Sequence, residues 1–281
     1  MNITIIGLGL IGGSIALDLR SQLCVNVIGI DANEEHRKKA LNLGLVSEVL
    51  SLEQGINKAD VVVIATPVDV IESLLPQVLD MINNKTVVTD VGSTKSLICE
   101  SIKDHKNRGR YVAAHPLAGT EFSGPTAALK GLYVGKKNII CDKEYSDTDA
   151  VETAQQVFKS IGLTSYFMNS REHDRHLAYV SHLSHVTSFT LGLTVLDIEK
   201  DEKQIFNLAS TGFESTARLA KSNPATWAAI FDKNNDFLVE AIDGYINQLQ
   251  KFKKAIASKN TYDMKTMMSE ANEIKRVLSK N

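Results

Sequence analysis

Over its first 165 or so residues the 281-residue chain alternates short apolar runs with segments of helical character, which constrains its fold more than any other feature. The runs are rich in β-branched residues and nearly continuous in apolar character, which is typical of parallel strands buried on both faces. They span residues 2–7, 25–31, 60–67, 85–93, 111–116 and 137–142. Helices are expected between and after them, at about 10–20, 33–43, 68–82, 94–106 and 147–161. This order predicts an α/β doubly wound sheet.

The pattern changes near residue 170, where strand-like runs stop and helical periodicity continues to the end of the sequence. Asn223-Pro224 predicts the start of one helix, because proline is tolerated in a first turn. We therefore expect two domains, a sheet domain at 1–168 and an all-α domain at 169–281. The apolar character of the second half also predicts a homodimer formed through it.

Composition limits the classes of partner that the protein can have. The net charge of −2 gives no broad basic surface for nucleic acid. No segment approaches the roughly 18 apolar residues of a membrane span. Three widely spaced cysteines, Cys24, Cys99 and Cys141, fit neither a disulfide framework nor a zinc site. We expect a cytoplasmic protein without nucleic-acid or membrane partners.

The sequence "GLGLIG" at residues 7–12 directly follows the first apolar run and opens a predicted helix. In this context Gly7 permits a tight turn, Gly9 lets the backbone approach a pyrophosphate, and Gly12 allows close packing of helix on strand. Free N–H groups at the start of the helix, at Leu10 and Ile11, suit the phosphates. The motif predicts a dinucleotide site, with a purely structural turn as the alternative.

Asp31 ends the second run, 24 residues after Gly7. A carboxylate there can accept hydrogen bonds from the ribose hydroxyls of NAD, whereas its charge would repel the 2′-phosphate of NADP. No arginine immediately follows it, so NAD is the favoured cofactor. The alternative is that Asp31 belongs to the start of a helix beside Asn33.

Polar residues follow three later strands, and ligands of open α/β sheets bind beyond the carboxyl ends of the strands. Thr66 and Pro67 are expected beside the cofactor. His115 is placed to take a proton from a substrate hydroxyl, because an imidazole with a pKa of about 6.5 is a suitable base near neutrality. Ser93 could bond the same hydroxyl or orient the imidazole; an N-cap for a helix from Thr94 is an equally good interpretation.

The helical half contains His173, His176, His182 and His185. At about 100° per residue the first two share one face of a helix and the last two lie on nearly the opposite face, so we predict no metal site. His182 and His185 are either hydrogen-bonded core residues or face a ligand. Arg218 is a candidate anion clamp, because guanidinium grips carboxylates bidentately, although it could also be a solvated helix residue.

Several blocks together resemble prephenate and arogenate dehydrogenases, the NAD(P)-dependent enzymes of tyrosine biosynthesis. They are "GLGLIGGS", "DVGSTKS", "AHPLAGTEFSG", "SHLSH" and "TGFESTARLAKSNPATW", in the family's order and spacing. The resemblance runs from Asn2 to about Trp227. It implies an N-terminal Rossmann domain, a C-terminal helical dimerisation domain and an active site in the cleft between them.

The resemblance also implies roles for individual residues. His115 would accept a hydrogen bond from the ring hydroxyl with help from Ser93, and Arg218 would bind a substrate carboxylate. Around them, Thr120 and Glu121 would line the mouth of the site, His182 and His185 would face the substrate, and Trp227 would lie near the pocket. Ser215 departs from the family, which often has aspartate there, so recognition of the substrate side chain stays open.

The implied activity is NAD-dependent oxidative decarboxylation of prephenate to 4-hydroxyphenylpyruvate, with arogenate as the alternative substrate. Two other classes were weighed. A β-hydroxyacid dehydrogenase usually carries a catalytic lysine where this chain has "REHDRHLAYVSHLSH". A non-catalytic NAD sensor would need neither the His115 block nor the paired histidines.

Overall fold

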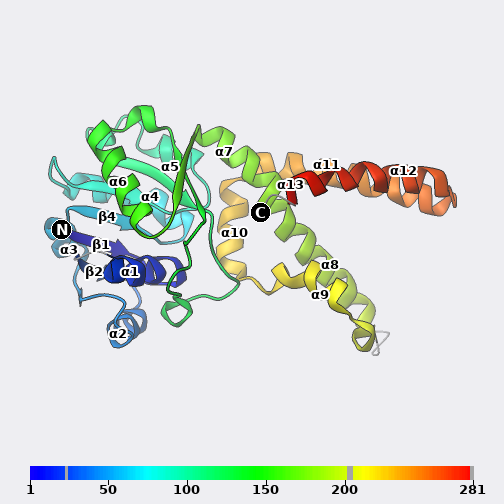
Figure 1. The fold of residues 1–281 in the computed structure, drawn as a ribbon, viewed down its shortest axis with the longest axis horizontal. Helices are drawn as coiled ribbons and strands as arrows, with labels where there is room; N and C mark the ends of the chain where they lie inside the picture. Colours follow the sequence, from blue (N-terminus) through cyan, green and yellow to red (C-terminus); the bar gives the residue numbers. More distant parts are fainter. Residues whose placement is uncertain (23–24, 201–204, 279–281) are drawn as a thin grey trace. The chain divides into compact units, whose positions relative to one another are not determined.

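The computed structural model describes residues 1–22, 25–200 and 205–278 (Figure 1). They form two compact units, Met1–Asn235 and Asp236–Asn281. The first unit contains the sheet, its flanking helices and the helices that follow as far as α10. The second contains most of α11 (Asn235–Ala257), with α12 (Thr261–Ala271) and α13 (Lys275–Leu278).

The sheet of the first unit has the strand order β3-β2-β1-β4-β5-β6-β7-β8 in the described residues. The strands are β1 (Asn2–Ile6), β2 (Asn26–Ile30), β3 (Glu48–Val49), β4 (Val61–Ile64), β5 (Val87–Asp90), β6 (Tyr111–Pro116), β7 (Lys137–Cys141) and β8 (Thr164–Met168). The order from β3 to β6 is that of a Rossmann fold, whose switch point lies between β1 and β4. The predicted doubly wound sheet is confirmed.

One predicted feature of the sheet is wrong. The run at 137–142 was expected as a parallel strand, but β7 is antiparallel to β6. Between these strands the described chain forms only a short 3₁₀ turn, Pro125–Ala127, and no helix that crosses a face of the sheet. A parallel partner needs such a crossover, so the chain enters β7 from the opposite end.

Three short elements escaped prediction because they lack a continuous apolar run. They are β3, α3 (Leu52–Lys58) and β8. β8 lies at the edge of the sheet with most of its side chains at least partly exposed, as the sequence "TSYFM" reflects. Its exposed edge position leaves few side chains to bury, and so weakens the pattern.

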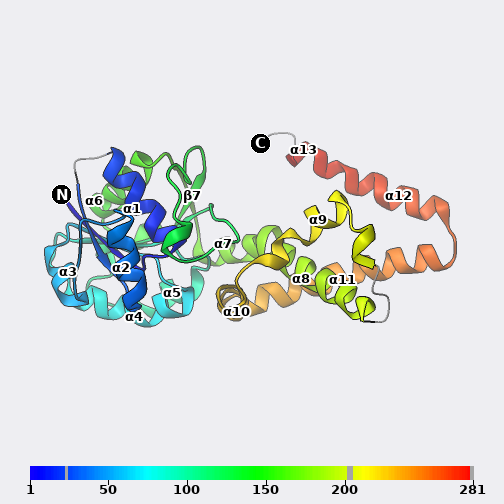
Figure 2. The ribbon, with the colours of Figure 1, turned by 90° about the horizontal axis from the view of Figure 1, so that it is seen from below.

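Helices cover both faces of the sheet (Figure 2). α1 (Leu10–Gln22), α2 (Glu34–Asn42) and α6 (Thr148–Ser160) pack on one face, and α3, α4 (Val68–Met81) and α5 (Ser96–Ser101) on the other. Along β4 the side chains alternate, with Val61 and Val63 in the first core and Val62 and Ile64 in the second. α5 ends at Ser101, so it is shorter than the helix expected at 94–106.

The helices after β8 are α7 (Ser170–Leu177), α8 (Leu183–Glu199), α9 (Thr211–Ala217) and α10 (Pro224–Lys233). The predicted start of α10 is confirmed, since the Asn223 side chain accepts hydrogen bonds from the N–H groups of Ala225 and Thr226. Lys233 at its other end forms an ion pair with Glu72 of α4 at 2.8 Å. This contact joins α10 to the sheet layer.

A π-helical turn at Ala178–His182 separates α7 from α8 and changes the direction in which later side chains point. A π turn holds an extra residue, so residues on its two sides leave the 100° register of an α-helix. His173 is buried and His176 is exposed, although both lie in α7, before the π turn. That these two histidines share one face stays a prediction. The prediction that His173 and His182 lie on nearly opposite faces assumed one continuous α-helix, which the π turn interrupts.

The two cysteines in the described residues, Cys99 and Cys141, are buried and free, and Cys24 lies outside the described residues. Within the described ranges no helix has both the length and the apolar character needed to cross a membrane.

Candidate active site

The glycine turn after β1 has the geometry that its three glycines suggest. Gly7 adopts a φ of 99°, and a Cβ there would lie 2.5 Å from the carbonyl oxygen of Ala65. A Cβ on Gly12 would overlap the carbonyl oxygen of Gly7. Gly9 differs, because a Cβ there would meet no protein atom within 4 Å. The protein itself requires the outer two glycines, whereas the space over Gly9 is open to a ligand.

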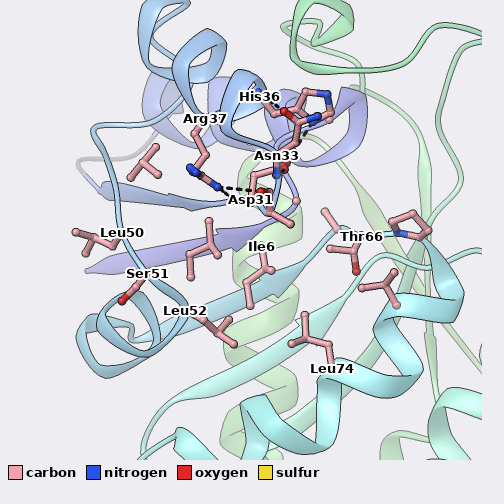
Figure 3. A pocket seen from close by; sticks show the side chains of 18 of the residues that line it. Ile6, Asp31, Asn33, His36, Arg37, Leu50, Ser51, Leu52, Thr66 and Leu74 are labelled. Atoms are coloured by element: carbon pink, nitrogen blue, oxygen red, sulfur yellow. Dashed lines mark hydrogen bonds and ion pairs between the residues drawn. The ribbon is translucent and has the colours of Figure 1, made fainter.

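A pocket of about 990 Å³ lies beyond the carboxyl ends of β1, β2 and β4 (Figure 3). Asp31 projects into it, and its carboxylate accepts hydrogen bonds from the backbone N–H groups of Leu8 and Asn33, both at 2.8 Å. Asn33 caps α2, so the alternative that Asp31 belongs to the helix is wrong. Asp31 ties the end of β2 to the glycine turn.

Arg37 lines the same pocket and was missed in the sequence. Its guanidinium donates hydrogen bonds to the carbonyl oxygens of Asp31 and Ala32, at 2.7 and 3.0 Å. The prediction depended only on the residue immediately after Asp31. The first turns of α2 bring Arg37, which is six positions after Asp31, back toward the end of β2.

The residues present fit a dinucleotide. Gly9 leaves room for a group to approach the backbone, and the N-terminus of α1 provides N–H groups. The hydroxyl oxygen of Thr66 is buried and has no hydrogen-bond partner among the described residues. A ligand group in the pocket would satisfy it, so the predicted Thr66 and Pro67 lie where a cofactor contact is expected.

A second pocket, of about 310 Å³, adjoins the glycine turn and brings together residues from distant parts of the sequence. Its lining includes the predicted residues Gly9, Leu10, Ile11, Thr66, Pro67, Ser93, Thr120, Glu121 and Trp227. Ser93 does not cap a helix, since α5 begins at Ser96 with Lys95 at the N-cap. His115, His182, His185 and Arg218 are not among the lining residues. His182 and His185 contact the lining residue Trp227, and Arg218 contacts the lining residue Glu121.

His115 lies in β6, and 8% of the residue is exposed. Its Nδ1 is 2.9 Å from Nε2 of His173, whose Nδ1 is in turn 2.8 Å from the carboxylate of Asp174. Burial, followed by the nearby His173, Lys95 and His182, holds the pKa of His115 well below its ordinary value. The imidazole is therefore neutral near pH 7 and can act as an acceptor.

The carboxylate of Asp174 also accepts hydrogen bonds from the backbone N–H groups of Lys95 and Ser96, at 2.8 and 2.7 Å. Although burial alone raises its pKa, the bonds from His173 and from Ser96 keep the pKa of Asp174 below its ordinary value. An ionised carboxylate thus joins α7 to the first turn of α5.

A buried lysine holds the ends of β5 and β6 together. The Lys95 side chain is fully buried, pairs with Asp90 and donates a hydrogen bond to the carbonyl oxygen of Ala114 at 2.9 Å. Asp90 also accepts a hydrogen bond from the Tyr111 hydroxyl at 2.7 Å. Such a pair is retained only where its charges are satisfied, and here it fixes the backbone beside His115.

His182 is buried beside Trp227, with ring centroids 6.1 Å apart. The side-chain amide of Asn234 donates to Nδ1 of His182 at 3.0 Å and to the carbonyl oxygen of Asp174 at 2.8 Å. Nε2 of His182 is buried and has no partner among the described residues. Burial lowers the pKa of His182 to about 4, so a neutral ring accepting at Nδ1 carries its hydrogen on Nε2.

His185 stacks on Trp227, with ring centroids 3.3 Å apart and planes 21° from parallel. Its Nδ1 is 3.1 Å from the carbonyl oxygen of Ser181, which can only accept a hydrogen bond. His182 and His185 are therefore hydrogen-bonded, and both contact an aromatic residue that lines the pocket. A position in the hydrogen-bonded core and a position facing a ligand, the two alternatives for these histidines, are therefore compatible.

Arg218 opens a short 3₁₀ helix, Arg218–Lys221, with 55% of its side chain exposed. One of its guanidinium nitrogens lies 4.0 Å from the carboxylate of Glu121, which lines the second pocket. Ser215, where the family often has aspartate, donates a hydrogen bond to the carbonyl oxygen of Gly212 at 3.0 Å. Within the described ranges no three His, Cys, Asp or Glu side chains gather to hold a metal.

Two family models together match most of the chain. Residues 15–167 match the nucleotide-binding domain of prephenate dehydrogenase, and residues 169–270 match its dimerization domain. The chain belongs to the prephenate dehydrogenase family.

Individual members of the prephenate dehydrogenase family resemble the chain over nearly its whole length. The prephenate dehydrogenase of Bacillus subtilis is 30% identical over 93% of this chain and 72% of its own length. A structure of the Aquifex aeolicus prephenate dehydrogenase with hydroxyphenyl propionate and NAD⁺ is 30% identical, with a TM-score of 0.90, covering 99% of this chain and 97% of the other. A Synechocystis arogenate dehydrogenase is 26% identical, with a TM-score of 0.79, covering 99% of this chain and all of the other.

Four residues of the site carried no predicted role in the sequence: Lys95, His173, Asp174 and Asn234. Each acts through a contact with a residue far away in the sequence, such as Asp174 with the N–H group of Lys95, 79 positions apart. The adjacent His173-Asp174 pair was a usable signal, because a carboxylate beside a histidine commonly orients it.

Replacing the glycines of the turn separates folding from ligand binding. Gly12→Ala is expected to lower the free energy of unfolding by about 1–3 kcal/mol or more, because its Cβ overlaps backbone. Gly9→Ala is expected to leave it within about 0.5 kcal/mol while weakening NAD binding at least about tenfold. Denaturant unfolding and a fluorescence titration with NAD would measure both. Equal effects of the two substitutions on stability would contradict the assigned roles.

The neutral state of His182 predicts how stability depends on pH. The unfolded chain takes up a proton near the ordinary pKa of 6.5 and the folded protein only at about 4, so between these values the unfolded state binds more protons. Stability should therefore fall as the pH drops from 6.5 toward 4, by about 1.4 kcal/mol per pH unit for each such histidine.

The matched variant is His182→Gln. Its free energy of unfolding should change less steeply with pH, because the contribution of one histidine is removed. His115 keeps its own share, because its pKa is lowered in the same sense. Urea unfolding at several pH values would measure the slopes, and identical slopes for the two proteins would show that His182 is not held neutral.

Proposed function

We propose that the chain catalyses the NAD-dependent oxidation of prephenate, with loss of CO₂, to 4-hydroxyphenylpyruvate. Membership of the prephenate dehydrogenase family supports this reaction, as does an Aquifex relative solved with NAD⁺ and hydroxyphenyl propionate. The observation that carries the proposal is the second pocket. It is lined by Gly9 of the glycine turn, by Ser93 after β5 and by Trp227 of α10, so a cofactor and an aromatic-sized substrate can meet in it.

The dinucleotide is held by groups already in place. Asp31 faces the ribose side of the large pocket, the open space over Gly9 admits the pyrophosphate, and the unpaired Thr66 hydroxyl supplies a hydrogen-bonding group. NAD supplies the acceptor for the hydride that leaves the carbinol carbon of the substrate.

His115 takes the proton of the ring hydroxyl while hydride leaves the same carbon. Its low pKa keeps the ring neutral at physiological pH, so Nε2 has a lone pair to offer. Ser93, in the pocket at the end of the neighbouring strand, bonds the same hydroxyl. The resulting dienone is conjugated toward the ring carboxylate. Loss of CO₂ leaves an aromatic phenolate, which becomes the phenol by taking back the proton held on His115. Aromatisation supplies the driving force.

The anionic end of the substrate is held by Arg218, with Thr120 and Glu121 at the mouth of the pocket. The 4.0 Å contact between the Arg218 guanidinium and the Glu121 carboxylate supports this arrangement. His182, whose buried Nε2–H has no partner within the described part of the chain, donates to a substrate oxygen. His185 orients Trp227 by stacking on it.

Three further assignments belong to the same proposal. Residues 1–168 form the NAD-binding domain and residues 169–281 the domain for substrate binding and dimerisation. The protein is a homodimer, supported by the match to a dimerization domain and by exposed Leu193, Leu196 and Ile198 on α8. It acts in the cytoplasm on a small anionic substrate, without nucleic-acid or membrane partners.

Formation of NADH with prephenate, arogenate and a panel of hydroxyacids tests the proposal directly. Turnover of prephenate to 4-hydroxyphenylpyruvate is expected. Preference for arogenate, with tyrosine as the product, would correct the substrate but keep the site. Turnover of only a hydroxyacid, or none with bound NAD, would overturn the proposal.

His115→Asn is expected to lower kcat by about 10²–10⁴, the usual contribution of a general base. Binding of NAD should be unchanged, because His115 does not line the large pocket. His176→Asn is the matched control, since His176 is exposed on α7. Steady-state kinetics would decide, and a near-normal kcat would remove His115 from its role.

Arg218→Ala is expected to raise the KM for prephenate about tenfold or more, the loss of one charge-assisted hydrogen bond, and to leave the KM for NAD little changed. Lys221→Ala, in the same short helix, controls for loss of positive charge. Equal rises in the two KM values would contradict the carboxylate role of Arg218.

A further inference from the structure

The chain of contacts from His115 through His173 to Asp174 runs through buried side chains and ends on an anion. Asp174 and His173 are almost fully buried, and the carboxylate is fixed by two backbone N–H groups at the start of α5. The carboxylate therefore has a defined position, and its contact with Nδ1 fixes the orientation of the His173 ring.

Each link of this chain determines where a hydrogen can lie. An ionised carboxylate only accepts hydrogen bonds, so Nδ1 of His173 must carry a hydrogen at the 2.8 Å contact. A neutral His173 then has an unprotonated Nε2, which can only accept. The partner in the 2.9 Å contact, Nδ1 of His115, must in turn carry a hydrogen.

We infer that His173 and Asp174 are positioning residues that hold neutral His115 in the tautomer with hydrogen on Nδ1 and a free lone pair on Nε2. This inference deepens the proposed function and rests on it, because only that tautomer can accept a proton from a substrate hydroxyl. With the reverse arrangement, His115 would present an N–H group to the substrate.

The same contacts hold the His115 ring in place while its charge changes during the reaction. When a proton moves from the substrate oxygen to Nε2 of His115, the O–H bond breaks, a new N–H bond forms and the imidazole becomes a cation. Its Nδ1–H group still points at the lone pair of His173, with the carboxylate of Asp174 beyond. The relay therefore keeps the Nδ1–H group of His115 in place without itself taking the proton.

The charged and titratable groups around His115 come from every element packed against it. They are His173 and Asp174 of α7, Lys95 and Asp90 at the ends of β5 and α5, and His182 of the π turn. Lys95 pairs with Asp90. Asp174 is the anion in direct contact with the relay, through Nδ1 of His173.

Two substitutions of His173 distinguish positioning from packing. His173→Gln can present an amide oxygen near the former Nε2 and so accept from Nδ1 of His115, whereas His173→Leu fills the space without an acceptor. We expect kcat to fall about 10²–10⁴ for the leucine variant, with little change in the KM for prephenate, and to stay within about tenfold of wild type for the glutamine variant.

A purely structural role of His173 predicts the opposite order of activity, with the glutamine variant less active than the leucine variant. A fully buried site tolerates leucine better than an unpaired amide, so glutamine would then be the more damaging change to stability and activity. Unfolding midpoints of both variants accompany the kinetics. A leucine variant as active as the glutamine variant would overturn the inference.

The wild-type protein supplies a second measurement that needs no active variant. In long-range ¹H–¹⁵N correlation spectra of ¹⁵N-histidine-labelled protein, protonated and unprotonated ring nitrogens resonate far apart. The His115 signals are identified by their loss in His115→Asn. Near pH 7.5 we expect Nδ1 of His115 to be protonated and Nε2 not; a protonated Nε2 would overturn the inference.

Failure of the inference and failure of the proposed function give different results. Absence of NADH formation with both prephenate and arogenate in the wild-type protein would reject the function, whatever the spectra show. A normal prephenate turnover with hydrogen on Nε2 of His115 would reject the positioning role alone.

Discussion

The ionised carboxylate of Asp174 is the interaction on which the site depends. Asp174 is 1% exposed, and its carboxylate accepts hydrogen bonds from the N–H groups that open α5 and from Nδ1 of His173. Its backbone carbonyl oxygen separately accepts a hydrogen bond from the amide of Asn234. Removing the carboxylate would leave several buried donors unsatisfied, at about 1–3 kcal/mol each. The strand ends beside α5, the helix α7 and the two buried histidines are thus arranged around one anion.

Two neutral histidines with opposite hydrogen-bonding roles lie near this anion. Burial lowers the pKa of both His115 and His182, so near pH 7 neither ring carries a charge. The two rings differ in the group that contacts Nδ1. His115 faces the acceptor nitrogen of His173, whereas His182 faces the donor amide of Asn234. The first is left with a lone pair and the second with a buried N–H group. These groups suit the proposed roles of a base and a hydrogen-bond donor toward one anionic substrate.

Much of the fold could be predicted because its signals are local. The β-branched runs located the central strands, and "GLGLIG" located a turn in which Gly7 and Gly12 are required by backbone contacts. The direction of β7 could not, since it depends on the absence of a crossover helix in the described loop before it. Likewise His173 received no role, because its contact with His115 joins positions 58 residues apart. Contacts such as Asp174 with Lys95 join distant positions and leave no local pattern.

Neutron diffraction from crystals of the deuterated, substrate-free protein would test the central claim most directly, because it locates hydrogen positions on all the ring nitrogens at once. The account predicts deuterium on Nδ1 and none on Nε2 of His115, together with deuterium on Nε2 and none on Nδ1 of His182. Deuterium on Nε2 of His115, or the same tautomer in both rings, would contradict it.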